Sequence, residues 1–364
     1  MIRLLHTADL HLDWAFPSYP ANRRALRRRE IIGVFYQLIS LAIEHNVQAV
    51  LIAGDLFESE LPSQEVRSAV TAGFTRLADH GVPVFLAPGH VEAHTGVYDR
   101  LDLPGNVCLV GGDEPNASHL LPMLTVYGFP TGFDRDFRPL QGFEPLDRPG
   151  IHLGILHGTY QGLPNKPEED NWLPIWPEDA ARSKLDYLAL GHYHEHFTAI
   201  HGETHLAYPG TPARLGFGQA QERCALLVSF GEGAPAIERL PLRDRPYLEF
   251  DFDLSVVSIE EVLDELDRRQ DPEACVRVIL HGAILDGLDF FAERVLARHT
   301  GSFFYLEAAD RTEIALPASG DTIQDAFIRR CQNSLREKDL STADRAALEY
   351  ALRAGLIALR GGRL

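Results

Sequence analysis

The N-terminal part of the chain alternates short apolar runs with longer segments of helical periodicity. Three apolar runs span residues 2–8, 47–54 and 82–89. Between them, residues 30–46 and 63–81 carry apolar side chains three and four positions apart, which is the spacing of an amphipathic helix. This strand–helix–strand–helix–strand order predicts a parallel sheet with right-handed crossover connections.

Strand-like segments follow one another more closely from about residue 105, separated by turns rich in Gly, Pro and Asp. They cover residues 106–112, 123–130, 151–158, 185–194, 204–210 and 223–230. Segment 160–179 differs, because its many prolines oppose regular structure, and we expect it to run over the surface as a long loop. The patterns together predict an α/β fold in which two sheets pack face to face and are flanked by the early helices.

A second module begins near "RDRPYLEFDFDL" (residues 243–254). Helical patterns at 258–270 and 288–300 alternate there with strand patterns at 276–284 and 302–309. Two further helices are predicted at 321–339 and 341–361. We therefore predict three domains, which span residues 1–243, a small α+β domain at 246–318 and a helical tail at 321–364.

Composition and charge narrow the classes of function. With 45% hydrophobic and 24% charged residues, the chain has the composition of an ordinary globular protein. It contains no apolar run of about eighteen residues, so we expect no membrane span. The N-terminus shows no long apolar stretch and no small-residue cleavage site, from which we expect a cytoplasmic protein.

The formal net charge of −18 opposes the binding of polyanions at long range. One local exception is the basic segment 22–30, which contains Arg23, Arg24, Arg27 and Arg28. These arginines form either the solvated start of a helix or an edge that contacts phosphates. We treat them as candidate DNA-binding residues.

Carboxylate and imidazole side chains recur where the predicted strands end. The candidate metal ligands are, in chain order, Asp9, His11, Asp55, His90, His157, His192 and His194. Ligands bind at the carboxyl ends of strands in open α/β sheets, so we expect these side chains to meet at one rim. Mixed carboxylate and imidazole ligands suit manganese, iron or zinc. A carboxylate such as Asp55 can bridge two cations about 3.5–4 Å apart, and such a pair clamps a phosphoryl group.

The order of these motifs (Asp-x-His, Gly-Asp, Gly-Asn-His, His-Gly, Gly-His-x-His) resembles that of the calcineurin-like metallophosphoesterases. Within that superfamily, "HTADLHLD", "AGDLFE" and "AYPGTPARLGFG" resemble the SbcD-type DNA-repair nucleases. The resemblance covers the chain up to about residue 240. It implies a two-sheet phosphoesterase sandwich followed by a small capping domain and a tail that binds an ATPase.

The resemblance also implies a ligand set for two divalent ions, with manganese as the favoured metal. Carried over residue by residue, the first metal would be held by Asp9, His11, Asp55 and His194. The second would be held by Asp55, His157, His192 and the residue at the Asn position of motif three, which is His90. The implied partners are DNA, an SMC-like ATPase of the SbcC type and a second copy of the chain.

Motif three departs from the family. The chain has Gly89, His90, Val91 and Glu92 where the family has Gly-Asn-His-Asp or Gly-Asn-His-Glu. His90 can replace the Asn ligand, because its Nδ1 projects about as far from the backbone as the amide oxygen. Val91 replaces the His that assists the leaving oxygen, and a positioned acid is typically worth about 10²–10⁴ in rate. Glu58 stands where many relatives have a His, and it would repel phosphate unless it is turned away.

Two histidines are candidates for the missing proton donor: His94, which we expect on a mobile loop, and His196, which alternates with His192 and His194. Three functions stay open. The leading one is a two-metal phosphodiesterase that acts on DNA ends with an SMC-like ATPase. The second is a catalytically weakened scaffold that keeps the metals and binds the ATPase through residues near 321–360. The third is a phosphodiesterase for small nucleotides.

Overall fold

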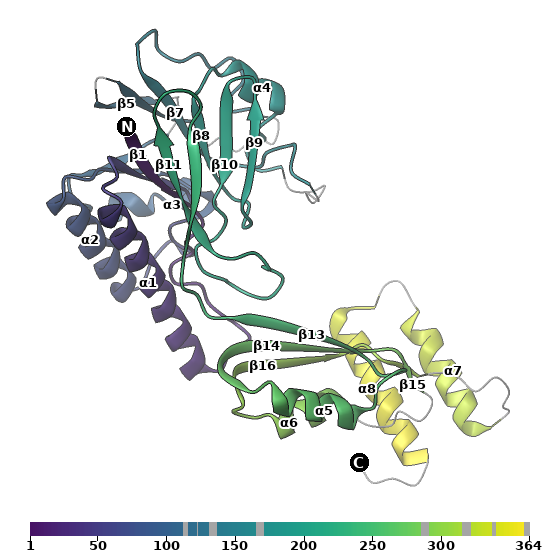
Figure 1. Cartoon of the computed structure of the whole chain (residues 1–364). Coiled ribbons are helices and arrows are strands. Elements are labelled where there is room, and N and C mark those ends of the chain that lie inside the picture. The colour runs from purple at the N-terminus through teal and green to yellow at the C-terminus, as the bar shows by residue number, and fades with distance from the viewer. Residues whose placement is uncertain are drawn as a thin grey trace. The chain divides into compact units, whose positions relative to one another are not determined.

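The computed structural model describes residues 1–111, 116–121, 123–130, 137–164, 171–284, 291–314, 322–336 and 340–359. The chain divides into two compact units, Met1–Arg245 and Pro246–Leu364. Each unit has its own core. The strands of each unit pair only among themselves in the described part of the chain (Figure 1).

The first sheet of the N-terminal unit has six strands in the order β12-β11-β1-β2-β3-β4. Strands β1, β2, β3 and β4 run parallel to one another. Strand β11 pairs antiparallel with β1, and β12 pairs antiparallel with β11. Their bounds are β1 Ile2–Thr7, β2 Ala49–Ala53, β3 Val84–Ala87, β4 Val107–Leu109, β11 Cys224–Phe230 and β12 Ala236–Pro241.

The second sheet also has six strands, in the order β5-β6-β7-β8-β10-β9. Strands β6, β7, β8 and β10 run parallel, while β5 and β9 are antiparallel at the two edges. Their bounds are β5 Asn116–Leu121, β6 Leu124–Gly128, β7 Ile151–His157, β8 Tyr187–Gly191, β9 Phe197–His201 and β10 Thr204–Tyr208.

One continuous apolar core joins the two sheets. It contains Leu51 and Phe85 from the first sheet and Leu153, Ile155 and Tyr187 from the second, all essentially inaccessible to solvent. Strand β2 contacts both β7 and β8 across this core, which brings the ends of those strands close together. The predicted α/β sandwich of two packed sheets is confirmed.

Two long helices flank the first sheet, as the periodicity predicts. α1 (Ala21–Glu44) and α2 (Gln64–Asp79) lie side by side, and α1 contacts β1 (Figure 1). The rings of Phe35 and Phe74 meet at a centroid distance of 5.7 Å between the two helices. α1 begins nine residues before the predicted helix at 30–46, so the basic segment 22–30 forms its first turns.

Two segments that we expected to be loops are ordered differently. Residues after β3 form the short helix α3 (His90–Thr95) and the 3₁₀ helix η1 (Val97–Arg100), so the expected mobile loop around His94 is wrong. The segment 160–179 is partly inside the protein, because Leu173 and Ile175 are buried and Ile175 bridges to Tyr160. Its last residues begin α4 (Pro177–Arg182), and residues 165–170 lie outside the described part.

The C-terminal unit is built on a three-stranded parallel sheet with the order β13-β14-β16. Helices α5 and α6 pack on this sheet around Val262, Leu266 and Val295, and α7 and α8 pack on each other. The bounds are β13 Tyr247–Asp253, α5 Ile259–Arg268, β14 Asp271–His281, β15 Ala283–Ile284, α6 Phe291–Arg298, β16 Phe303–Asp310, β17 Glu313–Ile314, α7 Ile323–Leu335 and α8 Thr342–Leu359. The finer division into domains at 246–318 and 321–364 stays a prediction, and residues 285–290, 315–321, 337–339 and 360–364 lie outside the described part.

No helix in the described part of the chain is both long and apolar enough to cross a membrane.

Candidate metal centre

All seven predicted ligands lie at the carboxyl ends of strands in the N-terminal unit. Asp9 and His11 follow β1, and Asp55 follows β2. His90 opens α3 after β3, and His157 is the last residue of β7. His192 and His194 follow β8.

Several of these residues have a backbone conformation that non-glycine residues rarely adopt. Asp9, His11, Asp55 and His192 have φ angles of 53°, 45°, 47° and 101°. A left-handed conformation costs about 1–3 kcal/mol for such residues and persists only when the surrounding structure imposes it. Here the His11 N–H donates to the Asp55 carbonyl at 3.0 Å, and the Asp9 N–H donates to Gly54 O at 3.1 Å. These bonds hold the two loops together.

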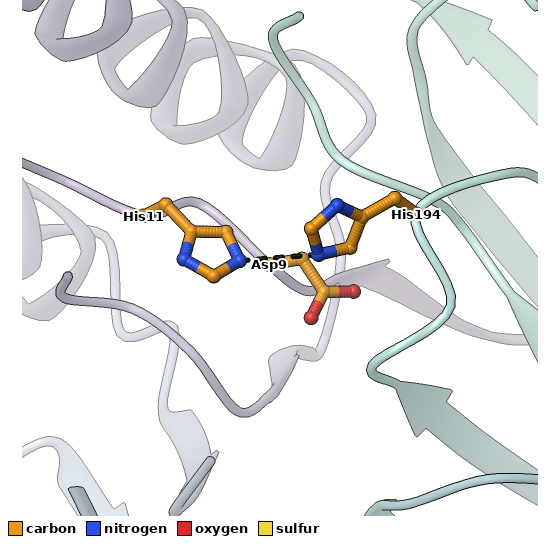
Figure 2. Close-up of side chains that lie close together, drawn as sticks. All are labelled: Asp9, His11 and His194. Atoms are coloured by element: carbon orange, nitrogen blue, oxygen red, sulfur yellow. Dashed lines mark hydrogen bonds between the residues drawn. The ribbon is translucent and has the colours of Figure 1, made fainter. Parts of the chain in front are cut away.

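Five of the predicted ligands form two groups whose donor atoms converge. The groups are Asp9, His11 and His194, and Asp9, Asp55 and His157. Asp9 belongs to both. Figure 2 shows the first group, in which the Nε2 atoms of His11 and His194 face each other at 3.2 Å beside the Asp9 carboxylate.

The carboxylate of Asp55 lies between the two groups. Its Oδ2 is 3.7 Å from His11 Nε2 and 3.4 Å from His157 Nε2. Burial alone would raise the pKa of Asp55, but the charges of His157 and His11 outweigh burial and hold the pKa well below its usual value. Asp55 is therefore a carboxylate that stays ionised in a buried place.

The surroundings of His157 fit a bound cation. Its Nδ1–H donates to Ala53 O at 2.9 Å, which leaves a lone pair on Nε2. Nε2 is buried and has no hydrogen bond within the described part of the chain. Burial alone would lower the pKa of His157, but the charges of Asp55 and Asp9 raise it to about 10. A positive charge is thus strongly favoured at this point, and a divalent cation satisfies both the lone pair and the carboxylates.

Backbone amides orient the two carboxylates. The His192 N–H donates to both oxygens of Asp9, at 2.9 and 3.1 Å, and the His90 N–H donates to Asp55 Oδ1 at 2.7 Å. Gly89 allows the second contact, because a Cβ at that position would lie 2.1 Å from Asp55 Oδ1. The glycine of motif three is therefore required by the close approach of the Asp55 carboxylate.

The imidazoles of the first group have opposite pKa shifts. Burial alone would lower the pKa of His11, but its hydrogen bond to Glu58 and the charges of Asp55 and Asp9 raise it. Burial lowers the pKa of His194 to about 4, against the opposing charge of Asp9. His194 is therefore neutral at pH 7, which is the form in which an imidazole binds a metal.

His90 and His192 lie beside these groups but belong to neither of them. The His90 ring is exposed and packs against Trp172 and His94, with centroid distances of 4.6 and 5.2 Å. The His192 ring lies 5.2 Å from the ring of His157. The metal-binding roles of His90 and His192 stay predictions.

The two candidate proton donors have different surroundings. His94 is exposed on α3, with its ring 5.4 Å from that of Trp172. His196 is half-buried, its Nδ1 bonds to Tyr208 O at 2.9 Å, and burial lowers its pKa. Both roles stay predictions.

Glu92 of motif three is buried and serves the backbone. Its carboxylate accepts hydrogen bonds from the N–H groups of Phe57 and Gly89, at 2.9 and 3.0 Å. Burial, together with the charge of Asp55, raises the pKa of Glu92 to about 7. Glu92 thus ties the start of α3 to the loop after β2.

The arginines of the basic segment are not equivalent. Arg27 has no solvent-accessible surface, and its guanidinium pairs with Asp244 at 2.6 Å and Glu30 at 3.0 Å. It is therefore unable to reach a phosphate on the surface, which corrects its assignment as a DNA-binding candidate. Arg28 donates to Trp14 O at 3.1 Å, while Arg23 and Arg24 are partly exposed.

Sequence reasoning missed the contacts of three side chains at the site: Glu58, Gln219 and Trp172. The sequence predicts that Glu58 repels phosphate unless it is turned away, and its carboxylate is bonded to His11 Nδ1 at 2.7 Å. Gln219 directly follows the motif "AYPGTPARLGFG", and its Nε2 lies 3.3 Å from His194 Nδ1. Trp172 lies in an irregular segment, where no periodicity indicated that it would meet α3.

The curated relatives of the chain are phosphoesterases and DNA-repair proteins. It is 24% identical over 302 residues to "Uncharacterized metallophosphoesterase YhaO" of Bacillus subtilis, which covers 77% of this chain and 72% of that protein. It is 27% identical over 292 residues to "DNA double-strand break repair protein Mre11" of Haloferax volcanii, covering 78% of this chain and 62% of the relative. For the protein of the same description from Methanosarcina mazei, the identity is 27% over 307 residues, covering 79% and 46%. The chain thus spans less than two thirds of the length of these two Mre11 proteins.

A family model described as "Calcineurin-like phosphoesterase" matches residues 2–217. That range contains both sheets up to β10 and every predicted metal ligand. The resemblance predicted from the motifs is confirmed, and the chain belongs to the calcineurin-like phosphoesterase family.

Proposed function

We propose that the protein is a two-metal-dependent phosphodiesterase that cleaves DNA ends. The observation that carries the proposal is the convergence of Asp9, Asp55 and three imidazoles in two groups that share Asp9. Two adjacent cation sites with a common carboxylate are the arrangement that clamps a phosphoryl group. The relatives that bear the description "DNA double-strand break repair protein" support DNA as the substrate.

The candidate ligands are assigned to two metal ions by their positions in the site. Asp9, His11, His194 and Asp55 would hold one divalent ion, and Asp55 and His157 would hold the other, with Asp9 close to both. His90 and His192 are the proposed additional ligands of the second ion. When bound, two such ions lower the pKa of water and neutralise charge on the phosphoryl group, and we propose manganese because the donors are carboxylates and imidazoles.

The residues around the carboxylates keep the site in one arrangement. The N–H groups of His192 and His90 fix the oxygens of Asp9 and Asp55. Glu92 anchors the start of α3, so the backbone that carries His90 stays against Asp55. A prearranged cluster of charges does not have to reorganise during the reaction.

The proposed reaction lacks an assigned acid to protonate the leaving oxygen. Val91 occupies the place of the family's His and carries no proton. His94 and His196 remain the proposed alternatives. A substrate whose leaving group needs no proton should therefore be cleaved more readily than DNA.

We further propose that the protein acts on DNA in the cytoplasm, in a complex with an SMC-like ATPase of the SbcC type. In this complex it would be a homodimer. The tail helices α7 and α8 are the proposed site for the ATPase, because they pack mainly on each other in the described part of the chain. A partner could supply most of the grip on DNA, which fits the net charge of −18. Arg23, Arg24 and Arg28 are the remaining candidates for direct phosphate contacts.

Val91 favours a second candidate function, a weakened scaffold that keeps its metals. A phosphodiesterase for small nucleotides is less favoured, since the carboxylate of Glu58 is engaged by His11 and no longer argues against DNA.

The test measures the hydrolysis of two substrates, linear duplex DNA and bis(4-nitrophenyl) phosphate, each with and without Mn²⁺. The proposal expects Mn²⁺-dependent cleavage of both, with Asp9→Asn and His157→Ala inactive on both. Cleavage of the nitrophenyl ester alone would favour a small-molecule substrate. Mn²⁺ binding without any cleavage would favour the scaffold, and failure to bind Mn²⁺ would refute the metal site.

A further inference from the structure

Glu58 is placed beside His11 by the backbone. The loop after β1 and the loop after β2 are joined by a ladder of hydrogen bonds, in which the Leu12 N–H donates to Leu56 O at 3.0 Å and the Glu58 N–H donates to Leu12 O at 2.9 Å. Leu12 and Phe57 form an isolated parallel bridge. The side chain of residue 58 therefore starts next to that of residue 11, whatever that side chain is.

The side-chain contact between these residues is short and partly shielded from water. His11 Nδ1 lies 2.7 Å from Glu58 Oε2, and the side chains are 9% and 30% exposed. A carboxylate only accepts hydrogen bonds, so Nδ1 must carry the proton. A neutral His11 then has its lone pair on Nε2, which is the atom that faces His194 and Asp55.

The other side of the site does not involve Glu58. The Leu215 N–H donates to Gln219 Oε1 at 2.9 Å, and Gln219 Nε2 lies 3.3 Å from His194 Nδ1. The Nε2 atoms of His11 and His194 lie 3.2 Å apart, on the ring sides away from Glu58 and Gln219. The contact with Glu58 thus assigns the Nδ1–H tautomer to His11.

We propose that Glu58 is a positioning residue for the metal centre, which holds His11 in the tautomer and ring orientation that direct Nε2 at the cation. A carboxylate behind a metal-binding imidazole fixes its tautomer and increases its basicity. The inference rests on the proposed function, because it takes His11 to be a ligand. It also assigns a use to a carboxylate that would otherwise repel the phosphate of the substrate.

The experiment compares Mn²⁺ affinity by titration calorimetry for Glu58→Ala and for the matched control Glu60→Ala. Glu60 is exposed and lies two residues further on, so its removal changes the net charge equally without touching His11. Glu58→Ala should weaken Mn²⁺ binding by about 10–100-fold, as removal of such a partner typically does. Glu60→Ala should leave the affinity unchanged.

The second measurement does not depend on the metal. Long-range ¹H–¹⁵N spectra of the histidine rings report which nitrogen carries the proton, and a His11→Gln spectrum assigns the signal. We expect the Nδ1–H form of His11 in the metal-free wild type and a mixture of tautomers in Glu58→Ala. An unchanged tautomer in Glu58→Ala, or an affinity loss no larger than that of Glu60→Ala, would overturn the proposal.

Two further outcomes are also decisive. If Glu58→Ala does not fold, the isosteric Glu58→Gln replaces it; its amide accepts more weakly than a carboxylate, so a smaller loss of affinity is expected, and no loss contradicts the proposal. If the wild type binds no Mn²⁺, the proposed function fails. The tautomer comparison in the metal-free protein still decides the role of Glu58.

Discussion

Replacing Asp9 by Asn should remove the metal-dependent part of the protein's thermal stability and leave the metal-free fold intact. Asp9 is fully buried and belongs to both groups of candidate ligands. Asn has the same shape and keeps one acceptor for the His192 N–H, which donates to both Asp9 oxygens. It lacks the negative charge that a divalent cation needs from its ligands.

The size of the effect follows from binding linkage. An ion that binds only the folded state, present at a hundred times its Kd, adds about 2.7 kcal/mol to the free energy of unfolding. Each kcal/mol shifts the Tm of a domain of this size by about 2–4 °C, so saturating Mn²⁺ should raise the wild-type Tm by about 5–11 °C. We expect almost no rise in Asp9→Asn. Without metal, the two proteins should differ by less than about 1 kcal/mol, because losing a buried charge beside Asp55 offsets a weaker hydrogen bond.

The assay is thermal unfolding followed by tryptophan fluorescence, in EDTA and across an Mn²⁺ titration. Trp14, Trp172 and Trp176 are the three tryptophans of the chain, and all lie in the N-terminal unit, so the signal reports on the unit that holds the site. Asp102→Asn, at an exposed position, is the control for loss of one negative charge. If Asp9→Asn kept the full Mn²⁺-dependent rise in Tm, Asp9 would not be a ligand and the two-site reasoning would be refuted.

Three other changes test separate parts of the structure. If the missing acid limits the reaction, Val91→His should raise the rate of DNA cleavage by about 10²–10⁴-fold and have little effect on hydrolysis of the nitrophenyl ester. If Val91→His and the wild type cleaved DNA at the same rate, another group would already donate the proton. Arg27→Ala should cost about 3 kcal/mol in urea unfolding, because it leaves Asp244 buried without its main partner, and DNA affinity at several salt concentrations should not change. His6 is completely buried, and burial lowers its pKa to about 3. As the pH falls below about 6.5, this histidine takes up a proton in the unfolded chain but not in the folded one. The contribution of His6 to the free energy of unfolding should therefore be fully present above pH 6.5 and should fall by up to about 1.4 kcal/mol per pH unit between pH 6.5 and about 3. His6→Gln should remove that part of the acid sensitivity in pH-dependent unfolding, and an identical pH profile would contradict the assignment.

Local pattern was sufficient for the elements that use one periodicity throughout. The strands and helices before residue 90 follow the alternation of apolar runs and amphipathic segments, because each element keeps one side-chain period along its length. Pattern failed for short or irregular elements. α3 has only six residues, so too few positions carry a helical period. The buried Ile175 lies among prolines that suggested a surface loop.

The sequence by itself determined where the chemistry gathers. Asp9, Asp55 and His157 each follow or end a strand, and parallel strands end at a common edge, so the order of the motifs was enough to predict one site. The tertiary structure decided what individual side chains do there. Arg27 pairs with Asp244, 217 positions away, and His11 is tied to Glu58 by a contact between two loops. Such pairs depend on how separate strands are packed and how their loops are held, and no spacing along the chain records that.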